Sequence, residues 1–134
     1  MSQVLRITIV MSIFFAGLLE FAESQTNKDE ITKLLMQNGC AEKQINFLPI
    51  HLNSKDQSSQ DFLAFCQDSC GANQCAYSIY VERSKKITYA GDFFGNFKVL
   101  KKVNKNYFDI EVLGQHPLTG PSTVTLHFNG EIYK

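Results

Sequence analysis

Three of the chain's four cysteines lie within ten residues, in the stretch C-Q-D-S-C-G-A-N-Q-C from Cys66 to Cys75, and the fourth is Cys40. Thiols at such spacing can hold a metal ion, form a redox centre or form disulfides. Structural zinc usually takes two separated C-x₂₋₄-C pairs, and a redox dithiol usually presents C-x-x-C, whereas the spacings here are C-x₃-C and C-x₄-C. We therefore expect disulfides, with no metal and no cofactor.

Four cysteines allow three pairings. Cys70 and Cys75 bracket G-A-N-Q, a turn-prone tetrapeptide that can bring their Cα atoms within bonding range. We therefore predict that Cys70 pairs with Cys75 and that Cys40 pairs with Cys66. The second bond would close a loop of about 25 residues and stabilise the fold by about 3 kcal/mol through the unfolded state.

A polar loop, H-L-N-S-K-D-Q-S-S-Q-D-F-L from residue 51 to residue 63, holds Asn53, Asp56 and Asp61. Short oxygen-bearing side chains in alternation can wrap Ca²⁺, which takes six to eight oxygen ligands. The favoured interpretation is that Asp56 and Asp61 instead accept hydrogen bonds from nearby backbone groups. Weak calcium binding at Asn53, Asp56 and Asp61 is retained as an alternative.

Residues for acid and base chemistry are scattered. His51, His116 and His127 lie far apart and match no metal or triad spacing. The closest acidic pair, Asp109 and Glu111, lies two residues apart on a predicted strand, and we expect both carboxylates on its solvent side. We therefore predict that the protein is not an enzyme.

The elements that position these residues are one helix followed by strands. T-N-K-D-E-I-T-K-L-L-M-Q-N-G predicts a short amphipathic helix with Thr26 as N-cap and Gly39 as its stop. Six β-branched and aromatic segments follow, over residues 45–52, 75–82, 86–91, 97–103, 107–113 and 122–128, and Asn129-Gly130 predicts a hairpin. We expect an α+β, mainly β fold: an antiparallel meander forming a small sandwich or barrel.

Alternating residues identify the core face of three of these strands. They are Tyr77, Ile79 and Val81; Phe108, Ile110 and Val112; and Val124, Leu126 and Phe128.

The first residues indicate export. A short start with one cation precedes a mostly apolar run over residues 7–19, which is too short to span a bilayer, and small residues follow at Ala22 and Ser24. We predict a signal peptide over residues 1–24 and a single disulfide-stapled domain over residues 25–134, periplasmic or secreted, with no stable membrane anchor after cleavage.

Charge is balanced overall, with 13 Lys and Arg against 13 Asp and Glu, which argues against a nucleic-acid partner. Locally, the sequence from Arg83 to Lys105 contains seven Lys or Arg residues and only one acidic residue, Asp92. A solvated outer face is the simpler interpretation of this run, and a docking surface for a partner is the alternative. The candidate partner-binding residues are Phe93, Phe94, Phe97, Lys98, Lys101 and Lys102.

The order of motifs carries a family resemblance. The polar loop, the C-G-A-N-Q-C turn, the aromatic strand A-Y-S-I-Y-V and the ending N-G-E-I-Y together resemble small exported bacterial β-proteins of unassigned function with a D-L-N-G-D-G-x-x-D-type loop and a C-G-x-x-x-C turn. Here His51 replaces the first Asp of that loop and the turn glycines are absent. The resemblance implies a calcium loop that has lost ligands.

These observations favour a non-enzymatic binding protein of the bacterial cell envelope, with an unknown protein or envelope polymer as partner. An alternative is an inhibitor of an envelope hydrolase such as lysozyme. Small exported β-barrel inhibitors of that kind carry a loop ending G-x-x-Y, which Gly130 to Tyr133 match, although Asn129 replaces their Ser.

Overall fold

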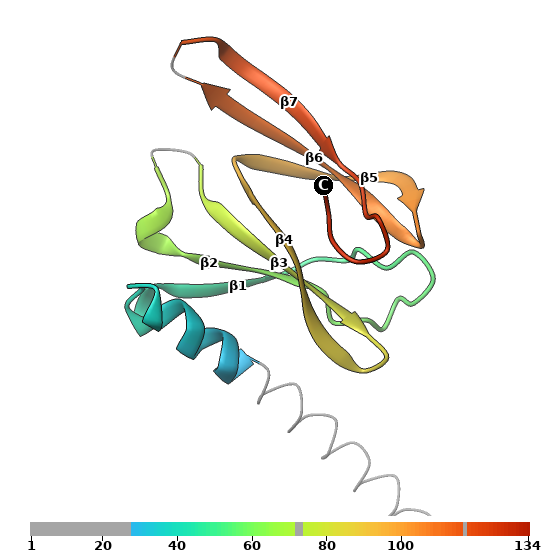
Figure 1. Ribbon diagram of the computed structural model, residues 1–134, viewed down its shortest axis with the longest axis horizontal. Coiled ribbons are helices and arrows are strands. Elements are labelled where there is room, and N and C mark those ends of the chain that lie inside the picture. Colours follow the sequence, from blue (N-terminus) through green and yellow to red (C-terminus); the bar gives the residue numbers. More distant parts are fainter. Residues whose placement is uncertain (1–27, 72–73, 117) are drawn as a thin grey trace, which may run out of the picture.

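The computed structural model describes residues 28–71, 74–116 and 118–134 (Figure 1). The predicted signal peptide, the predicted N-cap Thr26 and the side chain of His116 lie outside what is described. Within the described part, one helix (residues 28–37) precedes seven antiparallel strands that form two sheets. The mainly β expectation and the meander are confirmed, and the two sheets do not close into a barrel.

The first sheet contains the strands in chain order, each hydrogen-bonded to the next: β1 (Ile45–Pro49), β2 (Phe62–Cys66), β3 (Ala76–Arg83) and β4 (Lys86–Phe94). Short 3₁₀ turns, η1 (Glu42–Gln44) and η2 (Gln67–Ser69), lead into β1 and out of β2. Pro49 has no N–H to donate to a ladder, and its strand is accordingly at the edge of the sheet. Strand β2 was not predicted.

The helix covers one face of this sheet. Ile31 is buried and Leu35 packs beside it, against Phe62 and Tyr80. The helix ends at Gly39, whose φ of 94° lies in the left-handed region that favours glycine. The predicted stop is therefore confirmed.

The second sheet contains β5 (Asn96–Asn104), β6 (Tyr107–His116) and β7 (Gly120–Leu126), in that order. Strand β4 runs into β5 through Gly95, where the chain passes from one sheet to the other (Figure 1). Gly95 has a φ of 132°, and a Cβ at this position would lie 2.6 Å from the carbonyl oxygen of Leu113. Only glycine fits this passage without a shift of the backbone.

Both sheets contribute to one hydrophobic core. Its fully buried members include Leu52, Leu63 and Ile79 from the first part of the chain and Ile110 from β6. The predicted core positions are confirmed for Ile79, Val81, Ile110, Val112 and Phe128, while Tyr77 and Leu126 pack partly buried against the same core.

Val124 does not follow the predicted alternation, because 55% of it is exposed. It lies on β7, an edge strand, and the β6–β7 hairpin extends beyond the first sheet (Figure 1). Among the described residues, the apolar alternation in this part of the hairpin therefore does not correspond to burial.

The cysteines form two disulfides, Cys40–Cys66 and Cys70–Cys75, as predicted. The first ties the end of the helix to the end of β2, and the second closes the connection into β3. Two such bonds fit an oxidising, non-cytoplasmic environment. Within the described residues, no helix has the length and apolar character needed to cross a membrane.

The last residues form a small hairpin, which confirms the Asn129-Gly130 prediction. The backbone N–H of His127 bonds to the carbonyl oxygen of Lys134 at 2.7 Å, and the N–H of Lys134 returns a bond at 3.0 Å. Tyr133 donates its backbone N–H to the carbonyl oxygen of Ala90 on β4 at 2.8 Å. The end of the chain therefore lies against the β4 edge.

Candidate functional site

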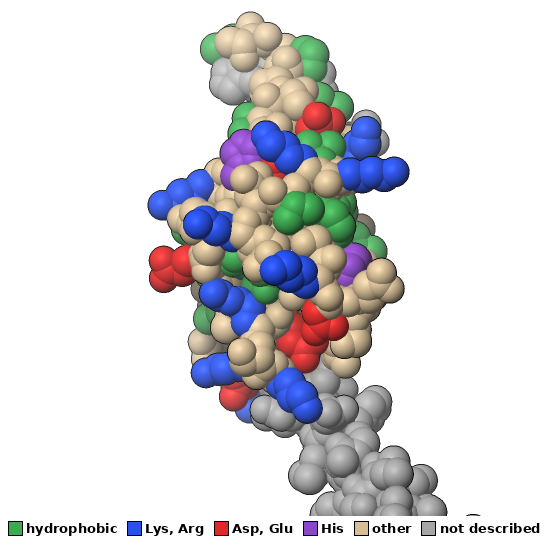
Figure 2. All heavy atoms as spheres, turned by 90° about the vertical axis from the view of Figure 1, so that its right-hand side faces the viewer, with side chains coloured by type: hydrophobic (Ala, Val, Ile, Leu, Met, Phe, Trp, Pro, Cys, Tyr) green, Lys and Arg blue, Asp and Glu red, His purple; other side chains and the backbone are tan. Residues whose placement is uncertain are grey.

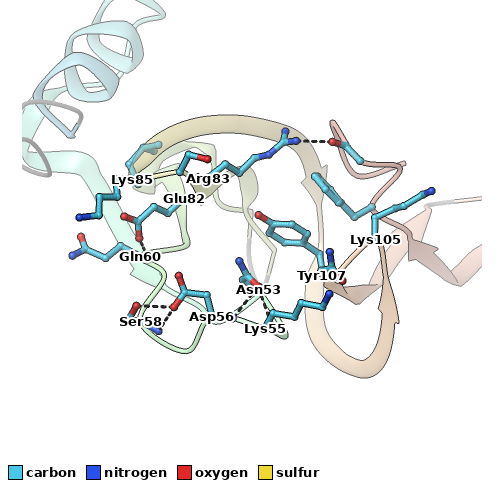
Figure 3. A pocket seen from close by; sticks show the side chains of 15 residues that line it. Asn53, Lys55, Asp56, Ser58, Gln60, Glu82, Arg83, Lys85, Lys105 and Tyr107 are labelled. Carbon is cyan, nitrogen blue, oxygen red and sulfur yellow. Dashed lines mark hydrogen bonds between the residues drawn. The ribbon is translucent and has the colours of Figure 1, made fainter.

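A polar cleft of about 660 Å³ opens where three loops and the end of the chain meet (Figure 3). The loop over residues 53–60 forms one wall, the β3–β4 turn and its flanks form a second, and the β5–β6 turn with Tyr107 forms a third. Phe128 and Gly130 of the terminal hairpin complete the lining. Segments far apart in the sequence thus contribute to one concave surface.

Asp61 connects two of these segments, the loop over residues 53–60 and strand β3. Asp61 is 2% exposed, and its carboxylate accepts four hydrogen bonds. The backbone N–H groups of Leu52 and Asn53 and the hydroxyl of Ser59 donate to Oδ2 at 2.9–3.0 Å. The backbone N–H of Glu82 on β3 donates to Oδ1 at 3.0 Å. Such charge-assisted bonds are stronger than neutral ones and fix the loop against the sheet.

The same loop is also attached to the second sheet through the backbone. The N–H of Phe108 donates to the carbonyl oxygen of Leu52 at 2.8 Å. The N–H and the hydroxyl of Ser54 both donate to the carbonyl oxygen of Asn106, at 2.8 and 2.9 Å. The cleft is therefore preorganised, because both of its sides are hydrogen-bonded to the loop between them.

Positive charge outweighs negative charge around the cleft. Its lining includes four cations, Lys55, Arg83, Lys85 and Lys105, and two acids, Asp56 and Glu82. Figure 3 shows Lys55 and Arg83 on opposite sides of the opening, with Lys85 and Lys105 at its two ends. The surrounding face carries many scattered Lys and Arg side chains (Figure 2).

Two of these cations occupy strained turn positions. The β3–β4 turn has φ values of 52° at Ser84 and 62° at Lys85, and the β5–β6 turn has 49° at Lys105 and 70° at Asn106. Two-residue hairpin turns of this kind prefer glycine and asparagine, because a Cβ is unfavourable at positive φ. Each turn nevertheless places a lysine there.

Tyr107 supplies a neutral hydrogen-bond donor. Figure 3 shows its hydroxyl directed into the cleft. Burial raises the pKa of Tyr107, the negative charges of Asp61 and Asp56 raise it further, and the positive charge of Arg83 opposes them. The hydroxyl consequently stays protonated at neutral pH and can donate to an acceptor on a ligand.

Arg83 and Glu82 are held in place by contacts across the cleft. Arg83 donates from its guanidinium to the carbonyl oxygen of Gly130 at 2.8 Å, and its guanidinium carbon lies 5.7 Å from the centre of the Phe128 ring. Glu82 accepts a bond from the backbone N–H of Gln60 at 2.6 Å. The guanidinium is thus held at the cleft by a carbonyl oxygen and by a cation–π contact with an aromatic ring.

No family model, no curated protein and no solved structure matches this chain. The cleft has therefore to be interpreted from its own chemistry.

In the loop considered for calcium, the side-chain oxygens accept hydrogen bonds from the protein itself. Asn53 Oδ1 accepts the backbone N–H groups of Lys55 and Asp56, at 3.0 and 3.1 Å. Asp56 Oδ1 accepts the N–H and the hydroxyl of Ser58, and these bonds, the hydroxyl first, lower the pKa of Asp56. Both oxygens of Asp61 face donors as well. Within the described residues, no three His, Cys, Asp or Glu side chains group as metal ligands.

The predicted partner-binding residues separate into two sets. Phe93 is 9% exposed, and Phe93, Phe97 and Tyr77 form a cluster with ring centres 5.2–5.5 Å apart. Phe93 is therefore a core residue and presents little of its side chain to a partner. Phe97 is partly buried against the same core, whereas Phe94 is 52% exposed. Lys98, Lys101 and Lys102 are exposed on β5, outside the cleft.

Tyr133 bears on the inhibitor alternative. It is 5% exposed, and its hydroxyl donates to the carbonyl oxygen of Phe108 at 2.9 Å. Burial raises its pKa well above the ordinary range for tyrosine. The G-x-x-Y sequence that suggested an inhibitor loop therefore ends in a core side chain, which is not presented to a partner.

The sequence did not predict the pair of Asp109 and His127. Asp109 is fully buried, contrary to the expectation that it faces solvent. Its carboxyl group lies 2.8 Å from Nδ1 of His127 and accepts a bond from Asn104 at 2.7 Å, so the buried polar group has two partners. Residues on different segments that meet only in the folded sheet cannot be recognised as a pair from their positions in the sequence.

Proposed function

We propose that this protein is an exported, non-enzymatic binding protein of the bacterial cell envelope, and that the cleft holds an anionic group of an envelope polymer. The observation that carries the proposal is the set of four cations around one preorganised cleft, two of them at turn positions where glycine is less strained. Strain retained at a surface turn is typical of a position kept for function.

The size and chemistry of the cleft favour one unit of a hydroxyl-rich polymer. A cavity of about 660 Å³ is in the range of small-ligand sites. Lys55 and Arg83 can bind an oxyanion, while Asn53 and the protonated hydroxyl of Tyr107 can hydrogen-bond to sugar hydroxyls. A uronic acid or a sugar phosphate provides both kinds of group.

Three probes with the same sugar body test the charge requirement: glucose, glucuronate and glucose 6-phosphate, titrated calorimetrically into the full disulfide-bonded chain. Both anions should bind, and glucose should bind at least about tenfold more weakly, since each charged contact contributes about 1.5–3 kcal/mol. The two anions distinguish a carboxylate from a phosphate ligand. Equal binding of all three, or binding of none, would contradict the proposal.

Matched variants test the location. Lys55→Gln combined with Lys105→Gln removes two cleft charges, whereas Lys101→Gln combined with Lys102→Gln removes two charges from β5 outside the cleft. Only the first pair should weaken binding of the anionic probes, by about tenfold or more. An equal loss in both pairs would mean that overall charge is responsible, and not the cleft.

The strained turn provides a further check. Lys85→Gly should weaken binding but leave the protein as stable as before or slightly more so, because glycine tolerates a φ of 62°. Ser84→Gly relaxes the neighbouring φ of 52° and keeps the charge, so binding should be unchanged. If Lys85→Gly lowers stability and leaves binding intact, the lysine is structural.

A further inference from the structure

Another cavity, of about 510 Å³, lies between the helix and the outer half of the first sheet. Its character is opposite to that of the cleft, because it is mainly apolar and acidic. Among the described residues that line it there is no Lys or Arg, and the two charged ones are Glu30 and Asp92. The full lining consists of Glu30, Ile31, Leu34, Leu35, Asn38, Ser78, Tyr80, Ile87, Tyr89 and Asp92.

The groove exists because the helix covers only part of the sheet face. Ile31 and Leu35 pack with Phe62 and Tyr80 over β2 and β3. On β4, the outermost strand of the sheet, Tyr89 remains 49% exposed. A strip of apolar surface thus lies open between the helix and the sheet edge.

Two tyrosines form an aromatic corner in this groove. Tyr80 and Tyr89 are cross-strand partners, their ring centres lie 5.9 Å apart, and their planes meet at 69°. Tyr80 is 7% exposed and forms the floor, whereas the half-exposed Tyr89 forms the rim. One face of Tyr80 is covered by Phe62, whose ring stacks on it at 5.4 Å between centres, so the half-exposed ring of Tyr89 is the one that can attract an organic cation by cation–π interaction.

A carboxylate is fixed at the same corner. Asp92 accepts a hydrogen bond from the hydroxyl of Ser78 at 2.8 Å and one from the hydroxyl of Tyr89. Burial and the bond to Asp92 raise the pKa of Tyr89 to about 12, so the tyrosine stays neutral at physiological pH. The carboxylate is held by two neutral donors, and no cation among the described lining residues neutralises it.

We propose that this groove binds a small organic ammonium compound, with its apolar body on Ile31, Leu34 and Ile87 and its cationic head beside the Asp92 carboxylate and the exposed ring of Tyr89. The groove volume is that of a single small ligand. Glu30 adds a second negative charge, so a cation is favoured over a neutral or anionic compound of the same shape. This inference is independent of the proposed function of the cleft.

Three probes that share a phenyl body and differ in charge test the proposal: phenethylammonium, 2-phenylethanol and phenylacetate. Binding to the full disulfide-bonded chain would be followed by amide chemical shifts. Phenethylammonium should bind about tenfold more tightly than 2-phenylethanol and should shift the amides around Leu34 and Ile87. Equal affinity for the three probes, or shifts confined to residues elsewhere, would overturn the proposal.

Variants at exposed positions separate the two parts of the site. Asp92→Asn keeps an acceptor for the neighbouring hydroxyls, and it should bring phenethylammonium to the affinity of 2-phenylethanol. Tyr89→Leu keeps an apolar surface but removes a ring, and it should weaken the ammonium about fivefold while leaving the alcohol nearly unchanged. Asp68→Asn, an exposed acid on η2 outside the groove, is the charge-matched control. A loss with Asp68→Asn as large as that with Asp92→Asn would also refute a specific site.

Discussion

Asp61→Asn should be among the most destabilising single substitutions at the cleft, although it changes one atom. The amide can present its oxygen toward three of the four donors, but its NH₂ then faces the N–H of Glu82, which loses its acceptor. An unsatisfied buried donor costs about 2 kcal/mol, and each of the three remaining bonds weakens by about 0.7 kcal/mol once the charge is gone. The expected loss is about 4 kcal/mol.

Urea denaturation measures this loss. With a slope of about 1.5 kcal/mol per M for a domain of this size, the midpoint should fall by about 2–3 M. Asp56→Asn is the matched control in the same loop, because Asp56 is exposed and its amide oxygen can still accept from Ser58. Its midpoint should remain close to that of the unchanged chain.

Calcium provides the test that would refute this reasoning. If Asp61 and Asp56 belonged to a cation site, Ca²⁺ would raise the midpoint relative to a chelator, and both substitutions would abolish that rise. The structure leads us to expect no effect of Ca²⁺, because the oxygens of Asp61 face N–H and O–H donors. A fall of less than about 0.5 M for Asp61→Asn would likewise show that the four bonds are not what holds the loop.

Three further outcomes are expected. Gly95→Ala should lower the free energy of unfolding by about 3 kcal/mol or more, because its Cβ would lie 2.6 Å from a backbone oxygen. Gly120→Ala has open space around it and should lower it by about 1 kcal/mol. Thermal melting of the two variants makes the comparison. Replacing Cys40 and Cys66 together by serine should cost about 3 kcal/mol in the same assay, and an unchanged melting temperature would contradict the disulfide's role. The pKa of Tyr89 is about 12 in the folded state and 10.0 ordinarily, so its contribution to stability is complete below pH 10 and is lost as pH rises toward 12. Tyr89→Phe should remove this part of the pH dependence of alkaline unfolding. The same variant should lose the corresponding step in the absorbance titration.

The sequence predicted those features that arise from local pattern. Gly39 and Asn129-Gly130 are short-range signals with a steric cause, and the structure confirms both. Alternation located Ile79 and Ile110 in the core because a strand with one buried face must alternate. The cysteine pairing followed from one turn-prone segment. It favoured a bond between Cys70 and Cys75, which left Cys40 and Cys66 to pair with each other.

The cleft could not be predicted, because it depends on which loops meet in space. Lys55, Arg83 and Lys105 come from separate loops, and nothing in their spacing indicates that they share a cavity. Alternation along its strand predicted that Asp109 faces solvent. Its partner His127 lies on another segment, so nothing in the sequence indicated their contact. Phe93 was a candidate partner contact in the sequence, and its burial and the packing of Tyr77 against it identify it as a core residue.

The contact of Tyr133 with Ala90 has a practical consequence for handling the protein. Strand β4 is at the edge of its sheet, and the final residues cover part of that edge with a backbone hydrogen bond. An open edge is a template for pairing with a second chain. A truncation that removes the residues after His127 would therefore favour aggregation, and an affinity tag is better attached through a long, polar spacer than fused directly to Lys134.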